Sequence, residues 1–219
     1  GPFSIIGYLN LTQPAAGANL AIKSETPVRW TYNGSKIGDV KLEYSSDGGI
    51  NWTVIENNIL VANGSSYNWT SDKPWPTSTS ASGKIRVIDV NNSASNSSSG
   101  VINFTSSLKL TSHNNGADVT VGSTEYIYWT QYAAGVTNVS YSADGGGNWT
   151  LIQSILPNQT FMTTTWNVSN ATAVSNNCLI KVEDRVSIPG IIVSDTSNNT
   201  FAILPVFNMT GPVSGQGLI

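Results

Sequence analysis

Hydrophobic and polar residues alternate with a period of two along many short stretches of the chain, which is typical of β-strands that bury one face. In one stretch Val28, Trp30 and Tyr32 alternate with Arg29 and Thr31, and the stretch 40–44 repeats the pattern. The same criteria predict strands at 52–56, 66–70, 84–90, 101–105, 149–155, 163–168, 178–184 and 198–204. Clusters of Gly, Asn, Pro and Ser separate these stretches, and none has the 3.6-residue period of a helix. The pattern therefore predicts an all-β protein.

One set of landmarks occurs twice along the chain. The segment 44–53 (YSSDGGINWT) returns as 141–150 (YSADGGGNWT), 97 residues later. Trp30, Trp69 and Phe104 recur in the same order as Trp129, Trp166 and Phe201. Because about seven short strands per 100 residues suit an immunoglobulin-like sandwich, we predict two tandem domains of this fold, 3–105 and 106–204. Trp30 and Trp129 should be their central buried side chains.

The pattern of the first strand, at residues 9–12, recurs at 108–111 and again at 207–210. We therefore expect 205–219 to be the start of a truncated third repeat, with a polar tail as the alternative. Gly1 and Pro2 are typical of the remnant of a removed purification tag. Only about three residues, 105–107, link the two repeats, which predicts a semi-rigid rod.

The polarity of the chain comes from uncharged side chains. Charged residues make up 11% of the chain and the net charge is -3, whereas Ser, Thr and Asn occupy 75 of 219 positions. The chain has no basic patch for nucleic acid and no apolar run of about 18 residues to cross a membrane. Its 39% hydrophobic content, with seven Trp, is enough for packed cores. This composition indicates a folded, extracellular chain.

Each repeat contains a hairpin with the pattern Ser-x-Asp-x-Gly-x-Asn-Trp. Its residues are Ser45, Asp47, Gly49 and Trp52 in the first repeat, and Ser142, Asp144, Gly146 and Trp149 in the second. Asp followed by two glycines suits a turn with positive φ, in which the Asp side chain accepts backbone N–H groups. We therefore predict a structural role. A calcium site is the alternative, although calcium takes six to eight oxygens and no second carboxylate is near in sequence, so no cofactor is predicted.

This hairpin resembles the Asp box of sialidases and many other β proteins, a likeness that implies that its Trp caps the core. The complete repeat resembles the Ser/Thr-rich immunoglobulin-like domains of bacterial and archaeal cell-surface and S-layer proteins, related to yeast cell-wall proteins of the Kre9 type. The resemblance covers residues 5–204 and implies a fold without a shared catalytic set. The second repeat departs from it at 112–116, where the proline of the first strand is replaced, and at Cys178.

Catalytic arrangements are disfavoured by elimination. His113, in an Asn-rich turn, and Cys178, at the start of a strand at the other end of that repeat, are the single His and the single Cys of the chain. We expect His113 to be solvated and Cys178 to be a small buried hydrophobic residue. The 13 acidic residues are scattered through loops and outward strand positions, unlike a glycosidase pair. The chain is therefore predicted not to be an enzyme.

Two features are candidate contact sites for sugars or a neighbouring subunit. Tyr126 and Tyr128 flank Ile127, which is predicted to point inward, and so share an outer strand face. Trp75 lies between two prolines and has no equivalent in the second repeat. Cross-strand pairing or packing between repeats explains these aromatic residues as well.

Fifteen Asn-x-Ser/Thr sequons occur, and the candidate glycosylation sites include Asn10, Asn33, Asn68 and Asn103. Many sequons would arise by chance in a chain so rich in these three residues. The leading hypothesis is a non-enzymatic structural fragment of a secreted S-layer or cell-wall protein, which self-associates in a surface array. The alternative is an adhesin stalk or a carbohydrate-binding accessory module.

Overall fold

The computed structural model describes residues 7–34, 37–169 and 172–207. The prediction for 205–219 therefore lies almost entirely outside the described residues. The described chain is built of strands, with one 3₁₀ turn at Val61–Asn63. An all-β fold is thus confirmed, as is its division into two sandwiches, each with a three-stranded and a six-stranded sheet.

The described part of the first domain contains nine strands, β1 to β9. They are β1 Tyr8–Gln13, β2 Asn19–Ala21, β3 Thr26–Asn33, β4 Asp39–Ser45, β5 Thr53–Leu60, β6 Ser66–Trp69, β7 Ser80–Asp89, β8 Asn96–Ser98 and β9 Ile102–Thr105. One sheet has the order β1-β3-β6, and the other has β2-β9-β7-β4-β5 with β8 also paired to β7.

The second domain repeats this plan strand for strand. Its strands are β10 Ser107–Leu110, β11 Val119–Thr120, β12 Thr124–Tyr132, β13 Thr137–Ser142, β14 Thr150–Ile155, β15 Phe161–Asn167, β16 Ser175–Ile188, β17 Ile191–Thr196 and β18 Phe201–Leu204. The sheet orders are β10-β12-β15 and β11-β18-β16-β13-β14, with β17 on β16.

The strand order is that of an immunoglobulin-like sandwich, in which the chain moves between two facing sheets. The first strand segment is divided between the sheets, because β1 pairs antiparallel with β3 whereas β2 pairs parallel with β9. The pairs β10–β12 and β11–β18 repeat this division. The predicted strands coincide with observed ones, but the sequence pattern missed β2, β8, β11 and β17, because these are short or edge segments.

Each sandwich has its own hydrophobic core between its sheets. Trp30, Trp69 and Phe104 lie in the first core, and Trp129, Trp166 and Phe201 lie in the second. Trp30 and Trp129 are 2% and 1% exposed, which confirms their predicted burial. The burial of both tryptophans follows from the period of two, since their neighbours along the strand point outward.

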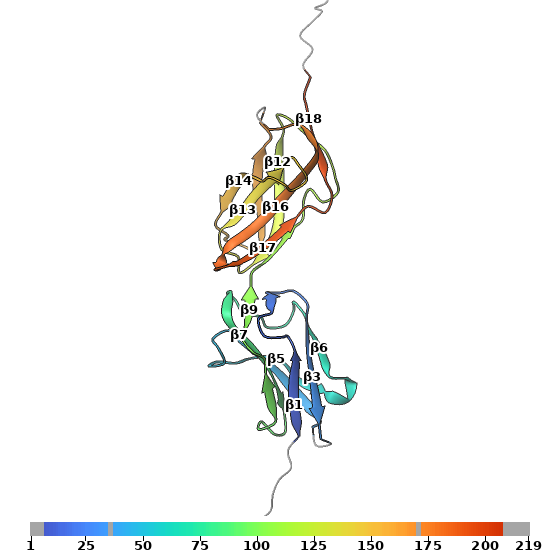
Figure 1. The fold of residues 1–219 in the computed structure, drawn as a ribbon, viewed down its shortest axis with the longest axis vertical. Helices are drawn as coiled ribbons and strands as arrows, with labels where there is room; N and C mark the ends of the chain where they lie inside the picture. The colour runs from blue at the N-terminus through green and yellow to red at the C-terminus, as the bar shows by residue number, and fades with distance from the viewer. Residues whose placement is uncertain (1–6, 35–36, 170–171, 208–219) are drawn as a thin grey trace, which may run out of the picture.

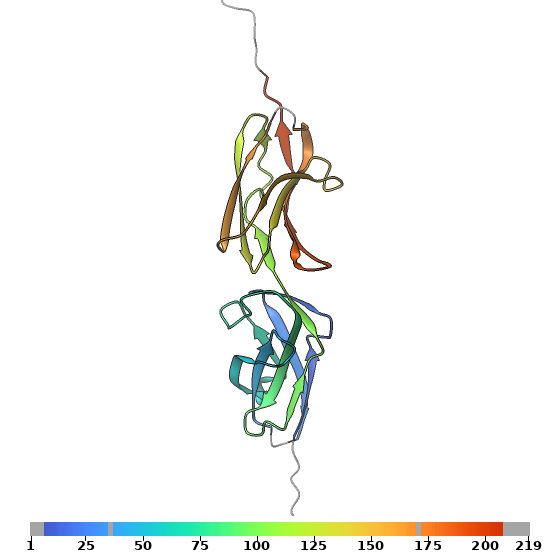
Figure 2. The ribbon, with the colours of Figure 1, turned by 90° about the vertical axis from the view of Figure 1, so that its left-hand side faces the viewer.

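The two domains follow one another along the long axis of the molecule, and the first and last described strands lie at opposite ends (Figures 1 and 2). Ser106 alone separates β9 from β10. This residue is 1% exposed, so the connection is enclosed by the two domains. The predicted short linker is therefore observed.

Candidate functional site

The hairpin between β4 and β5 is organised around Asp47. The Oδ1 atom of Asp47 accepts hydrogen bonds from Ser45 Oγ at 2.7 Å and from the Asn51 backbone N–H at 2.9 Å, and Oδ2 accepts one from Asn51 Nδ2 at 2.7 Å. Bonds from the Asn51 backbone and the Ser45 side chain hold the pKa of Asp47 at about 2. Gly48 and Gly49 have φ of 79° and 99°, a backbone conformation that favours residues without a Cβ.

The hairpin between β13 and β14 has the same geometry. Asp144 accepts hydrogen bonds from Ser142 Oγ at 2.7 Å and from Asn148 N and Nδ2 at 2.8 and 2.6 Å. The pKa of Asp144 is also about 2, chiefly because of the Asn148 backbone bond. In both hairpins the aspartate carboxylate accepts hydrogen bonds from the turn residues and thereby stabilises the turn. No group of three His, Cys, Asp or Glu side chains suited to a metal is found among the described residues.

The hairpin tryptophans do not cap the cores, which corrects the role implied by the Asp-box resemblance. Trp52 and Trp149 are half-buried and lie outside both core clusters. Arg86 lies over the Trp52 ring, 4.0 Å from its centroid, and Lys181 lies 4.4 Å from that of Trp149. Because these cations project from outward positions of β7 and β16, the rings pack on the outer sheet face as cation–π partners.

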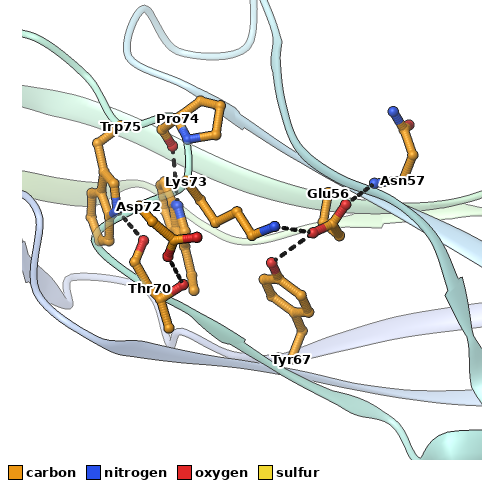
Figure 3. A network of polar contacts seen from close by, with 9 residues as sticks. Glu56, Asn57, Tyr67, Thr70, Asp72, Lys73, Pro74 and Trp75 are labelled. Carbon is orange, nitrogen blue, oxygen red and sulfur yellow. Dashed lines mark hydrogen bonds and ion pairs between the residues drawn. The ribbon is translucent and has the colours of Figure 1, made fainter.

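Trp75 is not an exposed contact residue, contrary to the expectation from sequence. It is 5% exposed and stacks on Trp69, with ring centroids 3.7 Å apart and an interplanar angle of 10°. Its Nε1 donates to the Thr70 carbonyl oxygen at 2.9 Å, and the Trp69 Nε1 donates to the Pro74 carbonyl oxygen at 3.1 Å (Figure 3). The loop after β6 therefore folds back and covers the core with Trp75.

The same loop is stabilised by a polar network next to Trp75. Lys73 Nζ lies 2.6 Å from Glu56 Oε2, and the Tyr67 hydroxyl donates to the same oxygen at 3.0 Å (Figure 3). The hydrogen bond from Lys73 holds the pKa of Glu56 below its usual value. Glu56 thus ties the loop after β6 to strand β5.

This loop also faces the second domain. A groove of about 360 Å³ is lined by Ile22, Pro74 and Trp75 of the first domain and by Tyr132 and Ala133 of the second. Ala133 packs against the first hydrophobic core. Trp75 therefore packs in the first core and also lines the domain junction, and packing between repeats was one alternative from the sequence.

Hydrogen bonds cross the junction. Ser106 Oγ donates to Asp184 Oδ2 at 2.6 Å, Thr79 Oγ1 donates to the Ser187 carbonyl oxygen at 3.1 Å, and Ser107 Oγ donates to the Ile22 carbonyl oxygen at 2.8 Å. These bonds join the linker and the β7 side of the first domain to the second.

Asp184 is the centre of the junction. Its carboxylate, 1% exposed, accepts bonds from Ser106 and Ser187 side chains and from the backbone N–H groups of Gly135, Val186 and Ser187. Burial acts to raise the pKa of Asp184, but the bonds from Ser106, Ser187 and the backbone outweigh it and lower the pKa. Sequence reasoning missed this residue. The available signal was the recurrence of Asp89 as Asp184, 95 residues later in the matching strand.

Tyr126 and Tyr128 project from the outer face of the β10-β12-β15 sheet. Their exposed fractions are 55% and 48%, and Ile127 between them is buried. The ring centroids are 6.4 Å apart with an interplanar angle of 17°, so the two rings lie nearly parallel. Phe161, 74% exposed on β15, lies on the same outer face. The structure therefore leaves this surface open for contact.

The single His and the single Cys of the chain both have buried side chains. The Cys178 side chain is fully buried, as predicted, and burial raises the pKa of its thiol. His113 is not solvated as expected, because its side chain is 8% exposed and its ring lies 5.7 Å from that of Phe201. Burial lowers the pKa of His113. The Asn-rich sequence around His113 is typical of an exposed turn, so it did not indicate that the ring covers the second core.

No protein-family model matches the sequence, and no curated protein matches it significantly. Solved structures give weak matches. The fibronectin(III)-like modules of Clostridium thermocellum CbhA are 16% identical over 90% of this chain and 94% of theirs, with a TM-score of 0.31. The titin I9-I11 tandem is 13% identical over 90% of this chain and 66% of its own, with a TM-score of 0.30. A Dscam structure is 10% identical over 90% of this chain and 46% of its own, with a TM-score of 0.31. Similarities at this level do not bear on function, so the fold assignment rests on the strand order described above.

Among the described residues, no helix is long and apolar enough to cross a membrane.

Proposed function

We propose that this chain is a structural segment of a secreted cell-surface protein, whose end-to-end immunoglobulin-like domains form a stiff rod within an S-layer or cell-wall array. The observation that carries the proposal is the junction, where one enclosed residue separates the domains. A linker this short permits few relative orientations, and a change of orientation would disturb the hydrogen bond from Ser106 in the linker to Asp184.

The contacts of the junction support rigidity in two ways. Ser106 and Thr79 hold the facing ends by hydrogen bonds, and Ala133 packs into the first core as an apolar contact. Bending would leave the buried Asp184 carboxylate without its Ser106 donor, which is costly for a buried charge. Stiffness of this kind is what a spacer or a lattice subunit needs.

The proposal places the chain outside the cell, with neighbouring copies as its partners. Its low charge and its many Ser, Thr and Asn side chains suit an extracellular surface, and Cys178 is buried away from oxidants. Tyr126, Tyr128 and Phe161 supply exposed aromatic area through which one copy could contact the next.

Small-angle X-ray scattering tests the rod. We expect one extended conformation, with a maximum dimension that stays constant with salt. Insertion of a Gly-Ser pair after Ser106 is the matched variant, and it should broaden the distance distribution. A broad distribution already in the unaltered protein would contradict the stiff rod. Sedimentation of the full-length parent tests the array, and a parent that stays monomeric would contradict it.

A second candidate function is carbohydrate binding, favoured by the parallel rings of Tyr126 and Tyr128. Such rings can stack on the faces of sugar rings, and the threonines of β15 beside them offer hydroxyl groups. A glycan array tests this role, with Tyr126→Ala and Tyr128→Ala as variants that should abolish binding. Trp75→Ala is unsuited as a variant here, because Trp75 is part of the core.

A further inference from the structure

The sequons of this chain are directional, which distinguishes them from an effect of composition. With 51 Ser and Thr among 219 residues, chance would place one of them two positions after about 6 of the 24 asparagines, but 15 are found. The reverse order, Ser/Thr two positions before Asn, occurs 7 times, close to chance. Alternation in strands enriches both orders equally, because residues i and i+2 share a face in either direction. The excess in one direction therefore indicates a sequence that is read by a modifying enzyme.

Duplication of the domain does not explain the excess. The hairpin asparagines Asn51 and Asn148 are equivalent, and their Nδ2 groups donate to Asp47 and Asp144 at 2.7 and 2.6 Å. The turn alone accounts for Asn at these two positions. Without them 13 sequons remain, and the two domains carry these at different positions: Lys109 stands where the first domain has Asn10, and Thr165 where it has Asn68.

The sequon asparagines are accessible to a modifying enzyme. Twelve of the fifteen have described side chains, of which ten are exposed and two, Asn103 and Asn138, are half-buried. Three exposed ones gather on one surface. Asn10 on β1 pairs with Thr31, Asn33 ends β3 opposite Tyr8, and Asn68 on β6 pairs with Pro27, so all three belong to the β1-β3-β6 sheet. Their side chains point away from the core of the first domain.

We propose that the exposed sequons outside the two hairpins are acceptor sites for N-linked glycans, and that Asn10, Asn33 and Asn68 place these glycans on the outer face of the β1-β3-β6 sheet. The covalent step forms a bond between the asparagine Nδ2 atom and the anomeric carbon of a sugar, and breaks the bond from that carbon to a phosphate oxygen of the lipid-linked donor that the host supplies. The lipid phosphate leaves with the bonding electron pair, and the proton lost by Nδ2 passes to a base of the modifying enzyme. The equivalent face of the second domain has Asn167 at the end of β15 and otherwise presents Tyr126, Tyr128 and Phe161. This sheet face would thus be covered by sugar in the first domain and left largely open for contact in the second.

Glycopeptide mapping by mass spectrometry of the parent protein from its own cells tests the proposal. We expect sugar on the peptides that contain Asn10, Asn33 and Asn68, and bare asparagine at the hairpin positions Asn51 and Asn148. Unmodified asparagine at all three sheet positions, or sugar found only on Ser and Thr, would overturn the proposal. Sugar on both hairpin asparagines would overturn the selection of sites by geometry.

A matched variant separates the sequon from local structure. The exchange of Asn10→Thr together with Thr12→Asn keeps the composition and the exposed polar face of β1, but reverses the motif. Secreted from cells with an N-glycosylation pathway, this variant should lose the glycan of that peptide and keep the one at Asn68. A glycan retained on the exchanged peptide would overturn recognition of the sequon. A bare but extended chain would refute this inference alone and leave the proposed rod standing.

Discussion

The two domains share one sandwich but complete it with different side chains. In the first, Trp69 is stacked between Tyr44 and Trp75. In the second, Trp166 stacks on Tyr141, and His113 covers Phe201 from another direction. The residues that face each other across the sheets are repeated, whereas the residues that close the ends of each sandwich are not. Core positions are therefore shared by the two domains, whereas the loop residues Trp75 and His113 have no counterpart in the other domain.

The polar contacts differ in the same way. Glu56 pairs with Lys73 and Tyr67 in the first domain, whereas the equivalent residue Gln153 accepts a neutral hydrogen bond at 2.5 Å from Thr164, the equivalent of Tyr67. The ion pair of Glu56 and Lys73 ties the loop that carries Trp75 to strand β5. The equivalent loop of the second domain contains no tryptophan, and the neutral hydrogen bond between Thr164 and Gln153 takes the place of the ion pair.

The largest effect should come from the central tryptophan of the second domain. Trp129→Ala removes a side chain that is 1% exposed and should cost about 3–5 kcal/mol of unfolding free energy. Hydrogen exchange of domain-specific peptides in increasing urea measures the two domains separately. The first domain should keep its own stability to within a few tenths of a kcal/mol, apart from its junction contacts. A second domain that unfolds at the urea concentration of the unaltered protein would show that the strand register is wrong.

Replacement of the buried junction carboxylate should have the next largest effect. Asp184→Ala leaves Ser106, Ser187 and two further backbone donors without their acceptor, and should cost the second domain about 2–3 kcal/mol. Asp89→Ala is the matched control at the equivalent position, where the Asn91 N–H is bonded at 3.0 Å. Only the Asp184 variant should also broaden the scattering distance distribution. Equal broadening by both variants would contradict a junction role.

The same carboxylate predicts a pH dependence of stability. The pKa of Asp184 is lowered in the folded state, so its contribution is present above the unfolded pKa, near 3.8, and is lost as pH falls through the folded value. The unfolding free energy of the second domain should therefore decrease as the pH falls below about 4. In the Asp184→Ala variant this decrease should be smaller. Urea denaturation at a series of pH values measures it. A variant with the same pH slope as the unaltered protein would show that Asp184 does not contribute.

A smaller effect is expected at the pair of Glu56 and Lys73. Both side chains are about one-third exposed, at 31% and 32%, so solvent screens their attraction. Glu56→Gln, which copies Gln153, should cost the first domain roughly 0.5–1 kcal/mol, and the difference should shrink in high salt. Gln153→Glu in the second domain is the comparison, since no lysine partner is positioned there by the repeat. A cost that is independent of salt would point to the Tyr67 hydrogen bond instead of the ion pair.

The repeat and the period of two were enough to predict the strands other than β2, β8, β11 and β17, the burial of Trp30, Trp129 and Cys178, and the exposure of Tyr126 and Tyr128. These predictions succeeded because each depends on local alternation, which the sheet preserves. The burial of Trp75 and His113 could not be predicted, because each lies in a loop whose path the period of two does not describe: the loop of Trp75 turns back onto Trp69, and His113 packs near Phe201, which is far away in the sequence. Asp184 was missed for a related reason: its donors include Ser106, which is 78 positions away in the sequence.

The smallest predicted effect concerns a hydrogen bond that one domain has and the other lacks. Trp129 Nε1 donates to Gln131 Oε1 at 3.1 Å, whereas Trp30 Nε1 is buried without a partner among the described residues. Gln131 is equivalent to Tyr32, which is 40% exposed and loses little apolar burial when replaced. Tyr32→Gln should therefore supply the missing acceptor and stabilise the first domain by about 0.5–1 kcal/mol.

Tyr32→Met, which has a side chain similar in size to Gln but without the amide, is the matched control and should give no gain in stability. In a Trp30→Phe background, which removes the donor, the benefit of Tyr32→Gln should vanish in urea denaturation. If the benefit persists there, it comes from some contact other than this hydrogen bond.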